Sequence, residues 1–252
     1  EKASTRTRVS FQVGIAQLGG QSLFLANHEL QLSRGEPIKD TARVLSRYVD
    51  AVIIRGNRHE DLIEFAHHSS VPVINALTDM YHPSQIIADL FSVREVGLDL
   101  SDFKIAWIGD GNNVANSWIN AAVVFGFTLD LACPEGYDPP EELLEKAQQQ
   151  GASVRVVRDP ALAAEKADVI YTDVWTSMGQ EEEKKKRLAD FKGFQVNKEL
   201  IDLALKGVKV MHCLPAHRGE EITDEALEGE SSIVFDQAEN RLHVQKAVLE
   251  LL

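Results

Sequence analysis

Short apolar runs alternate along the chain with longer stretches in which apolar positions recur at a helical period. The short runs are rich in Val, Ile and Leu and are bounded by Gly, Pro, Asp or Asn, which is typical of buried strands. They predict strands at residues 22–25, 51–55, 71–75, 104–109, 128–133, 154–157, 168–172, 209–214 and 232–235. The longer stretches predict helices at residues 6–18, 37–48, 60–68, 83–93, 115–125, 140–150, 161–166, 181–191 and 239–251.

This alternation predicts an α/β fold of two lobes, each a parallel β-sheet covered by helices. A chain of 252 residues suits two domains better than one. The stretch at 97–102 follows one set of strand–helix units and precedes the predicted strand at 104–109, so we place the boundary there. We expect one lobe at 1–96, a second at 100–235, and a last helix at 236–252 that packs back across the cleft.

Composition narrows the class of protein. Apolar residues make up 44% and charged residues 26%, the mixture of a folded globular chain rather than a disordered one. The net charge of −13 disfavours nucleic acid as a partner, because a phosphate-backbone binder needs a basic face. No apolar run approaches the ~18 residues of a membrane helix, so no membrane partner is expected. Cys133 and Cys213 are the only cysteines, which favours a reducing cytoplasm over a disulfide framework.

An anionic small molecule remains open as a substrate, because local arginines can outweigh a negative net charge. The first candidate site for it is Ser-Thr-Arg-Thr-Arg at 4–8, which leads directly into the first predicted helix. Hydroxyls, free backbone N–H groups and a guanidinium at a helix N-terminus suit a tetrahedral oxyanion. The alternative interpretation is an ordinary helix cap at Ser4 followed by surface arginines, and the motif alone favours that simpler interpretation.

Further polar groups stand where predicted strands end. Arg55 closes the run Ala-Val-Ile-Ile-Arg, and His82 and Gln85 open a predicted helix after the strand at 71–75. Because ligands of open parallel sheets bind beyond the carboxyl ends of the strands, these positions point to one rim. Taken alone, His82 is better explained as a capping or core-edge histidine.

The second lobe opens with a strand-to-helix turn, Gly109-Asp-Gly111-Asn-Asn113-Val114. Gly-x-Gly after a strand is part of a dinucleotide-binding fingerprint, but Val114 stands where the third glycine should allow helix and strand to pack closely. We therefore expect no nicotinamide or other cofactor. The turn offers asparagine side chains to a ligand instead.

Two more loops follow predicted strands: the segment from Asp173 to Gly179, and His212-Cys213-Leu214-Pro215. A carboxylate with nearby hydroxyl and backbone groups suits an amine, and Cys213 either orients that amine or acts as a nucleophile. A base for Cys213 is hard to find, since the adjacent His212 points to the opposite face of a strand. His212, Cys213 and His217 lack a fourth ligand and the usual spacing, so we expect no metal. The charge run at 181–187 is interpreted as a solvated surface helix.

These motifs, in this order, resemble the aspartate/ornithine carbamoyltransferase family, and the resemblance covers essentially the whole chain. Ser-Thr-Arg-Thr-Arg at 4–8 and His-Pro-x-Gln at 82–85 resemble the family's carbamoyl-phosphate motifs. The loop from Asp173 through Ser177-Met178-Gly179 resembles its ornithine-binding loop. His-Cys-Leu-Pro at 212–215 is similar to the loop that separates the ornithine enzymes from the aspartate ones.

The resemblance implies roles for individual residues. The catalytic residues it implies are Arg6, Arg55, His82, Cys213 and Arg241. The residues implied to bind carbamoyl phosphate are Ser4, Thr5, Arg6, Thr7, Gln31, Arg55, His82, Gln85, Cys213, Leu214 and Arg241. Those implied to bind the α-amino and carboxylate end of ornithine are Asn113, Asp173, Ser177 and Met178. Gln31 is implied to reach across a subunit boundary, which implies a homotrimer or a multiple of trimers.

The activity implied is transfer of the carbamoyl group of carbamoyl phosphate to the δ-amine of ornithine, giving citrulline and phosphate in arginine metabolism. Direct attack of the amine suits these residues, with domain closure on binding and no covalent enzyme intermediate. A carbamoyltransferase for another amine, such as putrescine, and a metabolite-binding protein of the same fold remain the alternatives. Members of the family carry a further N-terminal segment before residue 4, so we expect this chain to be part of a longer one.

Overall fold

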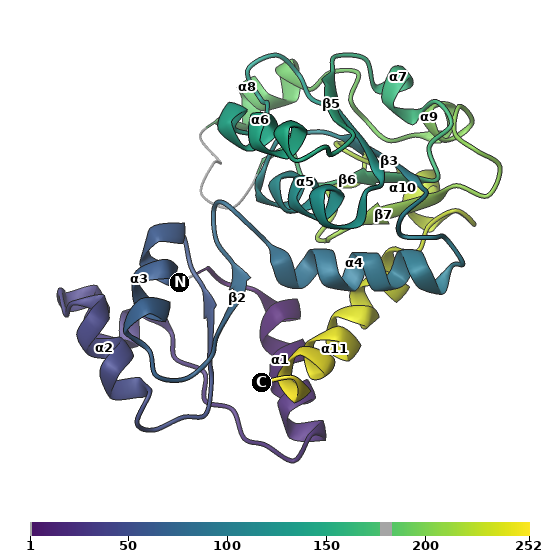
Figure 1. Ribbon diagram of the computed structural model, residues 1–252. Helices are drawn as coiled ribbons and strands as arrows, with labels where there is room; N and C mark the ends of the chain where they lie inside the picture. The colour runs from purple at the N-terminus through teal and green to yellow at the C-terminus, as the bar shows by residue number, and fades with distance from the viewer. Residues whose placement is uncertain (1, 177–182) are drawn as a thin grey trace. The chain divides into compact units, whose positions relative to one another are not determined.

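The computed structural model describes residues 2–176 and 183–252 and divides into two compact units. The first unit holds the chain up to Ala88 and again from Glu239 onwards, and the second holds Asp89–Ala238. The chain leaves the first unit within one helix and returns to it within another (Figure 1). Both units are α/β, with parallel strands and helices packed against them, as the sequence predicts.

The first unit is built around a pair of parallel strands, β1 and β2, with Val52 opposite Val73 in the register. Helices α2 and α3 bury Ala42, Leu62 and Phe65 within this unit. Its elements are α1 (Thr5–Gln17), η1 (Asn27–Glu29), η2 (Gln31–Arg34), α2 (Ile38–Leu45), β1 (Val52–Arg55), α3 (His59–His68), β2 (Val73–Leu77), the start of α4 (Pro83–Glu95) and most of α11 (Val234–Glu250).

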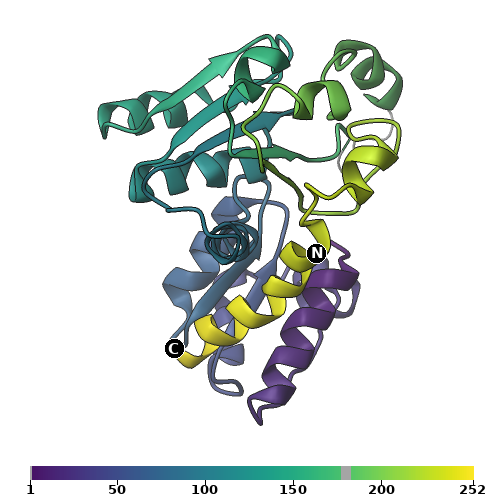
Figure 2. The ribbon, with the colours of Figure 1, turned by 90° about the vertical axis from the view of Figure 1, so that its right-hand side faces the viewer.

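Helices α1 and α11 run side by side in this unit, as both views of the ribbon show (Figure 2). Gly14 makes the close approach possible, because a Cβ at this position would lie 3.2 Å from Cγ of Lys246 and 3.5 Å from Cδ1 of Leu242. Lys246 also donates a 2.9 Å hydrogen bond to Oε1 of Gln17. The N-terminal motif is therefore fixed against the C-terminal helix, although the two are at opposite ends of the chain.

The second unit is a five-stranded parallel sheet in the order β5-β4-β3-β6-β7. The chain moves outward from β3 to β5 and then returns to β6 on the other side of β3. Its elements are the rest of α4, β3 (Lys104–Ile108), α5 (Asn113–Phe125), β4 (Thr128–Ala132), α6 (Glu141–Gln149), β5 (Val154–Val157), α7 (Pro160–Ala164), β6 (Val169–Thr172), α8 (Lys184–Asp190), α9 (Lys198–Ile201), β7 (Lys209–His212), α10 (Asp224–Glu228) and the start of α11.

Alternating side chains of this sheet fill two separate apolar layers, because successive residues of a strand point to opposite faces. On one face Trp107 stacks on Tyr171, its register partner on β6, and Trp118 of α5 packs edge-on against Tyr171. On the other face Ala106 and Ile108 belong to a buried cluster that α7, α9 and α10 help to form. Both faces are thus covered, which explains the unbroken apolar runs of these strands.

Two predicted strands are wrong. Residues 22–25 form no strand: Leu23 is 85% exposed, and no neighbouring strand pairs with this segment among the described residues. An apolar run needs a partner ladder to become a strand, and this run has none. At 232–235, Ser232 makes only a single bridge to Val210, and Val234 already begins α11. A short apolar run does not distinguish a buried strand from the first turn of a buried helix.

Within residues 2–176 and 183–252, every helix is too short or too polar to cross a bilayer.

Candidate active site

The strand order of the second unit brings three loops together at one edge of the sheet. Strands β3, β6 and β7 are neighbours and parallel, so the loops after Ile108, Thr172 and His212 leave the sheet side by side. The gap between β3 and β6 is also the point where the chain reverses its direction of winding. Ligands of open α/β sheets bind at such a point, beyond the carboxyl ends of the strands.

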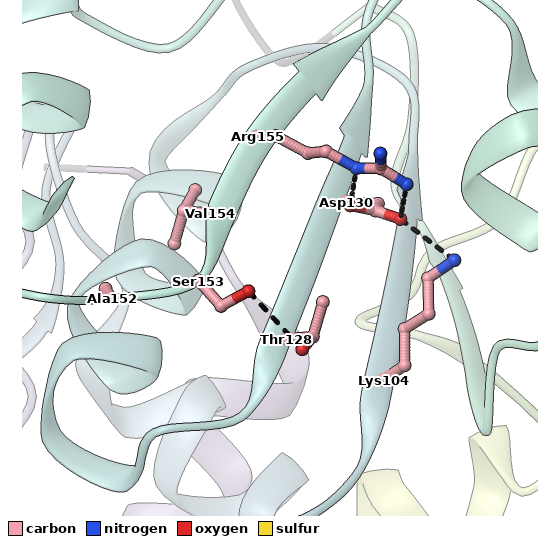
Figure 3. Close-up of a pocket in the computed structure, with 7 residues that line it drawn as sticks. All are labelled: Lys104, Thr128, Asp130, Ala152, Ser153, Val154 and Arg155. Carbon is pink, nitrogen blue, oxygen red and sulfur yellow. Dashed lines mark hydrogen bonds and ion pairs between the residues drawn. The ribbon is translucent and has the colours of Figure 1, made fainter.

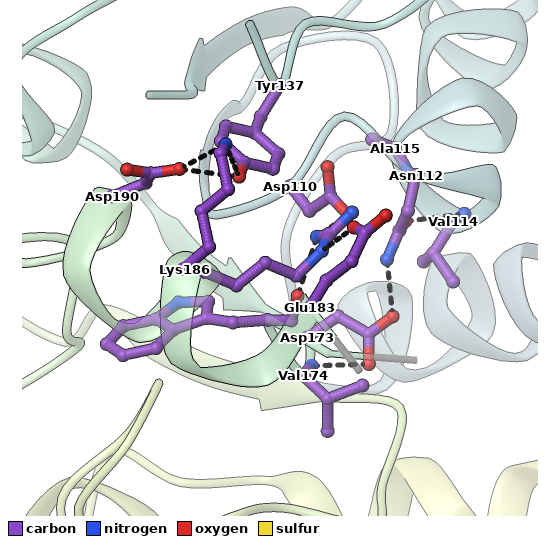
Figure 4. A network of polar contacts seen from close by, with 12 residues as sticks. Asp110, Asn112, Val114, Ala115, Tyr137, Asp173, Val174, Glu183, Lys186 and Asp190 are labelled. Atoms are coloured by element: carbon purple, nitrogen blue, oxygen red, sulfur yellow. Dashed lines mark hydrogen bonds and ion pairs between the residues drawn. The ribbon is translucent and has the colours of Figure 1, made fainter. Parts of the chain in front are cut away.

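Asp173, the first residue after β6, ties these loops together. Its Oδ2 accepts a 2.7 Å hydrogen bond from Nδ2 of Asn112, and its Oδ1 accepts the backbone N–H of Val174 at 2.8 Å (Figure 4). The same Oδ1 lies 3.0 Å from Sγ of Cys213, the first residue after β7, which donates its thiol hydrogen. Asp173 is 8% exposed, so one buried carboxylate links all three loops.

Asn112 holds the turn after β3 in shape as well as contacting Asp173. It is the N-cap of α5, and its Oδ1 accepts the backbone N–H groups of Val114 and Ala115. Gly111 is required just before it, because a Cβ there would clash with the backbone of Asp138 and Pro139. Packing therefore accounts for the second glycine of Gly109-x-Gly111. Asn113, the predicted ligand, is the first residue of α5 and lies beside these groups in the chain.

The loop after β7 is held from the opposite side by His212. The backbone N–H of Leu214 donates to Nδ1 of His212 at 2.9 Å, so Nδ1 carries the lone pair and the ring proton sits on Nε2. Nε2 then donates to Oε1 of Glu221 at 3.1 Å, and both side chains are fully buried. Leu214 takes a left-handed conformation with φ +56°. His212 thus anchors the loop through Leu214 and Glu221, while Cys213 contacts Asp173.

The second unit contains two separate groups of side chains that could each ligate a metal ion. The ligand atoms of Asp173, His212 and Cys213 are within 4.8 Å of one another, as are those of His217, Glu220 and Glu221. In the first group the thiol is hydrogen-bonded to Asp173 and the imidazole to Glu221. The first group is therefore interpreted as hydrogen-bonding residues that hold the loop after β7 in place.

The charge run at 181–187 was expected to be a solvated surface helix, and for Arg187 this is wrong. Its side chain is only 7% exposed, and its Nη1 donates at 2.7 Å both to Oδ2 of Asp110 and to the carbonyl of Trp175. Burial raises the pKa of the Asp110 carboxyl, and the neighbouring Arg187 guanidinium only partly offsets that rise. Within the described residues helix α8 spans Lys184–Asp190, and the first two residues of the predicted helix lie outside them. Charge pattern alone does not reveal a buried partner that lies 77 positions away in the sequence.

In the first unit the candidate groups gather around Thr7 on the first turn of α1. Ser4 caps the helix, and its Oγ accepts the backbone N–H of Thr7 at 3.2 Å. Nη2 of Arg241 donates to Oγ1 of Thr7 at 2.9 Å, and Nη1 of Arg55 lies 3.5 Å from the same oxygen. Nη1 of Arg241 donates to Oε1 of Gln85 at 2.8 Å. One hydroxyl therefore joins two guanidinium groups from β1 and α11.

His82 lies at the start of α4 and belongs to the same electrostatic environment. It is 4% exposed, and its Nδ1 is 3.4 Å from the hydroxyl of Ser84. Burial, followed by the charges of Arg241 and Arg55, lowers the pKa of the His82 imidazole well below its usual value. A neutral His82 beside two guanidinium groups leaves this end of the unit positively charged through arginine alone.

The remaining predicted residues stand apart from the Thr7 cluster. Arg6 is half-exposed and Thr5 is exposed, both on the first turn of α1. Gln31 is exposed on η2, and within the described part of the chain no hydrogen bond joins its side chain to the cluster. Ser177 and Met178 lie outside the described residues. Their predicted roles therefore depend on the resemblance rather than on observed geometry.

A shallow cavity of about 390 Å³ opens at the opposite edge of the second sheet (Figure 3). It is lined by Lys104, Asp130 and Arg155, the last two paired through two hydrogen bonds of 2.5 and 2.9 Å. Lys104 Nζ also contacts Asp130 at 2.9 Å. Burial alone would raise the pKa of Asp130, but the hydrogen bonds from Arg155 and Lys104 lower it. These charges satisfy one another across β3, β4 and β5, away from the loops described above.

The sequence interpretation missed several residues that shape the site. The asparagines of the turn at 109–114 were interpreted only as groups offered to a ligand. The capping role of Asn112 was missed, although asparagine is a favoured N-cap and this turn immediately precedes a helix. Asp110 could not be identified because its partner Arg187 is distant in the chain. Glu221 could not be identified because its partner His212 was considered only as a base for Cys213 and as a metal ligand. Only the three-dimensional arrangement pairs them.

Comparison with known proteins assigns both halves of the chain. Residues 1–95 match the carbamoyl-P binding domain of aspartate/ornithine carbamoyltransferase, and residues 101–252 match its Asp/Orn binding domain. The chain belongs to the aspartate/ornithine carbamoyltransferase family. This is the family that the motifs resemble.

Individual carbamoyltransferases are similar over nearly all of the chain. The ornithine carbamoyltransferase of Archaeoglobus fulgidus is 59% identical over 249 residues, which are 99% of this chain and 81% of the relative. That of Geobacter sulfurreducens is 56% identical over 253 residues, covering 100% of this chain and 84% of the relative. The solved ornithine carbamoyltransferase of Pyrococcus furiosus superimposes with a TM-score of 0.95 at 50% identity, covering 100% of this chain and 82% of that one.

Proposed function

We propose that the chain transfers the carbamoyl group of carbamoyl phosphate to the δ-amine of L-ornithine, releasing L-citrulline and phosphate. The observation that carries this proposal is the contact between Asp173 and Cys213, braced by Asn112, at the switch point of the second sheet. It places a carboxylate and a thiol together in the part of the chain that matches an Asp/Orn binding domain. That pair suits an amine substrate, since a carboxylate favours the amine's cationic end.

The first unit is proposed to bind carbamoyl phosphate. Ser4, Thr5, Arg6 and Thr7 present backbone N–H groups, hydroxyls and a guanidinium at the N-terminus of α1, where a phosphate is stabilised by charge and by hydrogen bonds. Arg55 and Arg241 add positive charge around Thr7. His82 and Gln85 are proposed to contact the carbamoyl end, with the neutral His82 imidazole able to donate one hydrogen bond to a carbonyl oxygen.

The ornithine end is proposed to bind through Asn113, Asp173, Ser177 and Met178. Asp173 suits the α-amino group, while the asparagine amide and loop N–H groups suit the α-carboxylate. Cys213 and Leu214 are proposed to line the reaction centre. The thiol of Cys213 donates to Asp173, which means that it is protonated, and a covalent nucleophile would have to be a thiolate. Cys213 is therefore proposed to orient the amine.

The reaction then proceeds by direct attack. The neutral δ-amine adds its lone pair to the carbonyl carbon and forms a tetrahedral intermediate with negative charge on the carbonyl oxygen. Arginine and N–H donors stabilise that charge. The bond from carbon to the phosphate oxygen breaks, phosphate leaves with the electron pair, and the nitrogen gives up one proton, which the departing phosphate takes. Holding both reactants in attack geometry, ~3–3.5 Å apart, supplies much of the acceleration.

Two alternatives remain as outcomes of the test. Putrescine lacks the α-carboxylate that Asn113 and the loop after Asp173 are proposed to bind, so these groups favour ornithine over a diamine. A binding-only protein that takes up carbamoyl phosphate would use the same arginines around Thr7, so the formation of citrulline is what separates it from the enzyme. A homotrimer with Gln31 at a subunit boundary, a cytoplasmic location and a place in arginine metabolism are also proposed, on the resemblance to family members and on two free cysteines.

The proposal is tested by incubating the purified chain with carbamoyl phosphate and ornithine and measuring citrulline and phosphate together. Equal amounts of both products are expected, formed only when both substrates are present. Phosphate release without citrulline would mean hydrolysis and would reject the transfer. Calorimetric binding of carbamoyl phosphate without any citrulline would instead support the binding-only alternative.

A further inference from the structure

Three buried polar side chains lie behind the loop that carries Cys213, and none of them belongs to the proposed site. They are Asp89 on α4, Tyr171 on β6 and Gln237 on α11, each with no solvent exposure. The hydroxyl of Tyr171 donates to Oδ2 of Asp89 at 2.8 Å. Nε2 of Gln237 donates to Oδ1 of Asp89 at 2.7 Å and to the Tyr171 oxygen at 3.0 Å. All three lie in the second unit.

The group connects directly to the backbone at the end of β7. Oε1 of Gln237 accepts the backbone N–H of His212 at 3.0 Å. His212 is the last residue of β7, and Cys213 follows it. Gln237 therefore holds the peptide from which the Cys213 loop departs, and Asp89 and Tyr171 hold Gln237.

The hydrogen bonds described above each have a definite direction. The Asp89 carboxylate only accepts, so the Gln237 amide must face it with Nε2, which leaves Oε1 for His212. Burial, followed by the charge of Asp89, raises the pKa of the Tyr171 hydroxyl well above its usual value, so this hydroxyl remains a donor. A fully paired buried network rigidifies its surroundings, whereas removing one member leaves its partners unsatisfied.

We infer that Asp89, Tyr171 and Gln237 are positioning residues that fix the backbone at His212 and thereby hold the Cys213 thiol against Asp173. The inference rests on the proposed function, because it assigns the Cys213 loop a part in the reaction. It predicts that loosening the network misplaces Cys213 without disturbing the residues proposed to bind phosphate. A misplacement of about 1 Å at a reaction centre lowers turnover by up to about 100-fold.

The first experiment compares the wild-type protein with Gln237→Leu. Turnover gives kcat and the KM for carbamoyl phosphate. Alkylation by iodoacetamide at one pH, without substrates, reports on the Cys213 thiol. Cys133 serves as an internal reference, because it is fully buried and burial raises the pKa of its thiol, so it stays unmodified in folded protein. We expect kcat to fall about tenfold or more, the KM for carbamoyl phosphate to change by less than about twofold, and Cys213 to be alkylated several times faster.

A swap of donor and acceptor separates positioning from simple loss of packing. Gln237→Glu alone places two carboxylates together. Asp89→Asn alone replaces one acceptor by a donor, so that an Asn oxygen turned toward Gln237 leaves the Asn NH2 against the Tyr171 hydroxyl, which loses its acceptor. The double variant Asp89→Asn with Gln237→Glu again pairs a donor with an acceptor and still offers an oxygen to His212. We expect both single variants to be impaired and the double variant to recover much of kcat and the slow alkylation of Cys213, a coupling that a double-mutant cycle measures.

Two further variants complete the design. Asp130→Asn weakens a buried ion pair at the other edge of the same sheet, so it should lower thermal stability and leave kcat and alkylation unchanged. Tyr171→Phe removes one oxygen only and replaces Gln237→Leu if the latter exposes Cys133. Alkylation and kcat within about twofold of wild type in the folded variants would overturn the inference. If the wild-type protein makes no citrulline, the proposed function fails, and the alkylation rates still test the positioning of Cys213.

Discussion

Arg241 and Thr7 are 234 positions apart in the sequence, and a guanidinium N–H of Arg241 donates a 2.9 Å hydrogen bond to Thr7 Oγ1. The contact joins α11 to the first turn of α1 and brings a positive charge to the N-terminus of a helix. The other terminal nitrogen of Arg241, Nη1, donates to Oε1 of Gln85. The guanidinium is thus oriented before any substrate binds, which is the arrangement that favours tight binding of an anion.

We predict that Thr7→Val weakens carbamoyl phosphate binding. The change removes the hydroxyl that orients Arg241 while keeping the shape of the side chain. A hydrogen bond to a charged group is worth about 1.5–3 kcal/mol, so the KM for carbamoyl phosphate should rise at least about tenfold. Thr7→Ser keeps the hydroxyl and serves as the control. Steady-state kinetics with unchanged KM in Thr7→Val would contradict the role given to this contact.

Cys213→Ser and Cys213→Ala distinguish an orienting thiol from a covalent nucleophile. Ser keeps a donor for Asp173, so we expect it to retain more activity than Ala, and we expect both to remain measurably active. A nucleophilic role predicts instead that both variants are silent and that wild-type protein mixed with carbamoyl phosphate gains a carbamoyl adduct. Mass spectrometry of the intact protein, quenched during turnover, detects such an adduct.

His82 makes the fold sensitive to acid. Burial and two arginines lower its pKa in the folded protein, whereas in the unfolded chain it has its ordinary value of about 6.5. The unfolded state therefore binds more protons between these two values, and stability falls as the pH drops below about 6.5 toward the lowered pKa. We predict that His82→Asn narrows the gap between the melting temperatures at pH 8 and pH 5.5. An equal gap in both proteins would show that the pKa of His82 is not lowered in the folded protein.

Arg187 provides a test of buried against exposed charge on the same helix. Arg187→Met leaves Asp110 buried without its cation, which costs about 3 kcal/mol or more and lowers Tm by roughly 10 °C. The adjacent Lys186 has a side chain that is 72% exposed and pairs with Asp190 on the surface, so Lys186→Met should leave Tm nearly unchanged. Thermal melts followed by circular dichroism measure both. Equal effects would mean that the Arg187–Asp110 contact is not a buried pair in solution.

The architecture follows from the sequence because its signals are local. The strands of the second sheet are short, mostly apolar runs between turn residues, interrupted only by Asp130 in β4 and Arg155 in β5, and the helices between them have clear periodicity. The two failures share a cause. Leu23 and its neighbours have the composition of a strand, and Ile233 and Val234 do too, but a ladder partner or a helix start is decided by packing rather than by composition.

Only part of the candidate site could be predicted from the sequence. Ser4, Thr7, Arg55 and Gln85 could be named because they stand at predicted element ends in a recognisable order, and the structure links Thr7 to both Arg55 and Arg241. The groups that hold the site in place could not be named. Asp89 and Gln237 lie 148 positions apart on helices whose polar faces look ordinary in sequence. The hydrogen bond between them forms only because the folded backbone brings α4 and α11 together.

The central claim is transfer to ornithine, and it is tested most directly by comparing ornithine with putrescine as carbamoyl acceptors in one preparation of the purified chain. Product is quantified by mass spectrometry over a range of amine concentrations. We predict a kcat/KM for ornithine that exceeds that for putrescine by at least about 100-fold, because a site built for an α-amino acid leaves polar groups unpaired with a diamine. Equal or greater efficiency with putrescine would contradict the account.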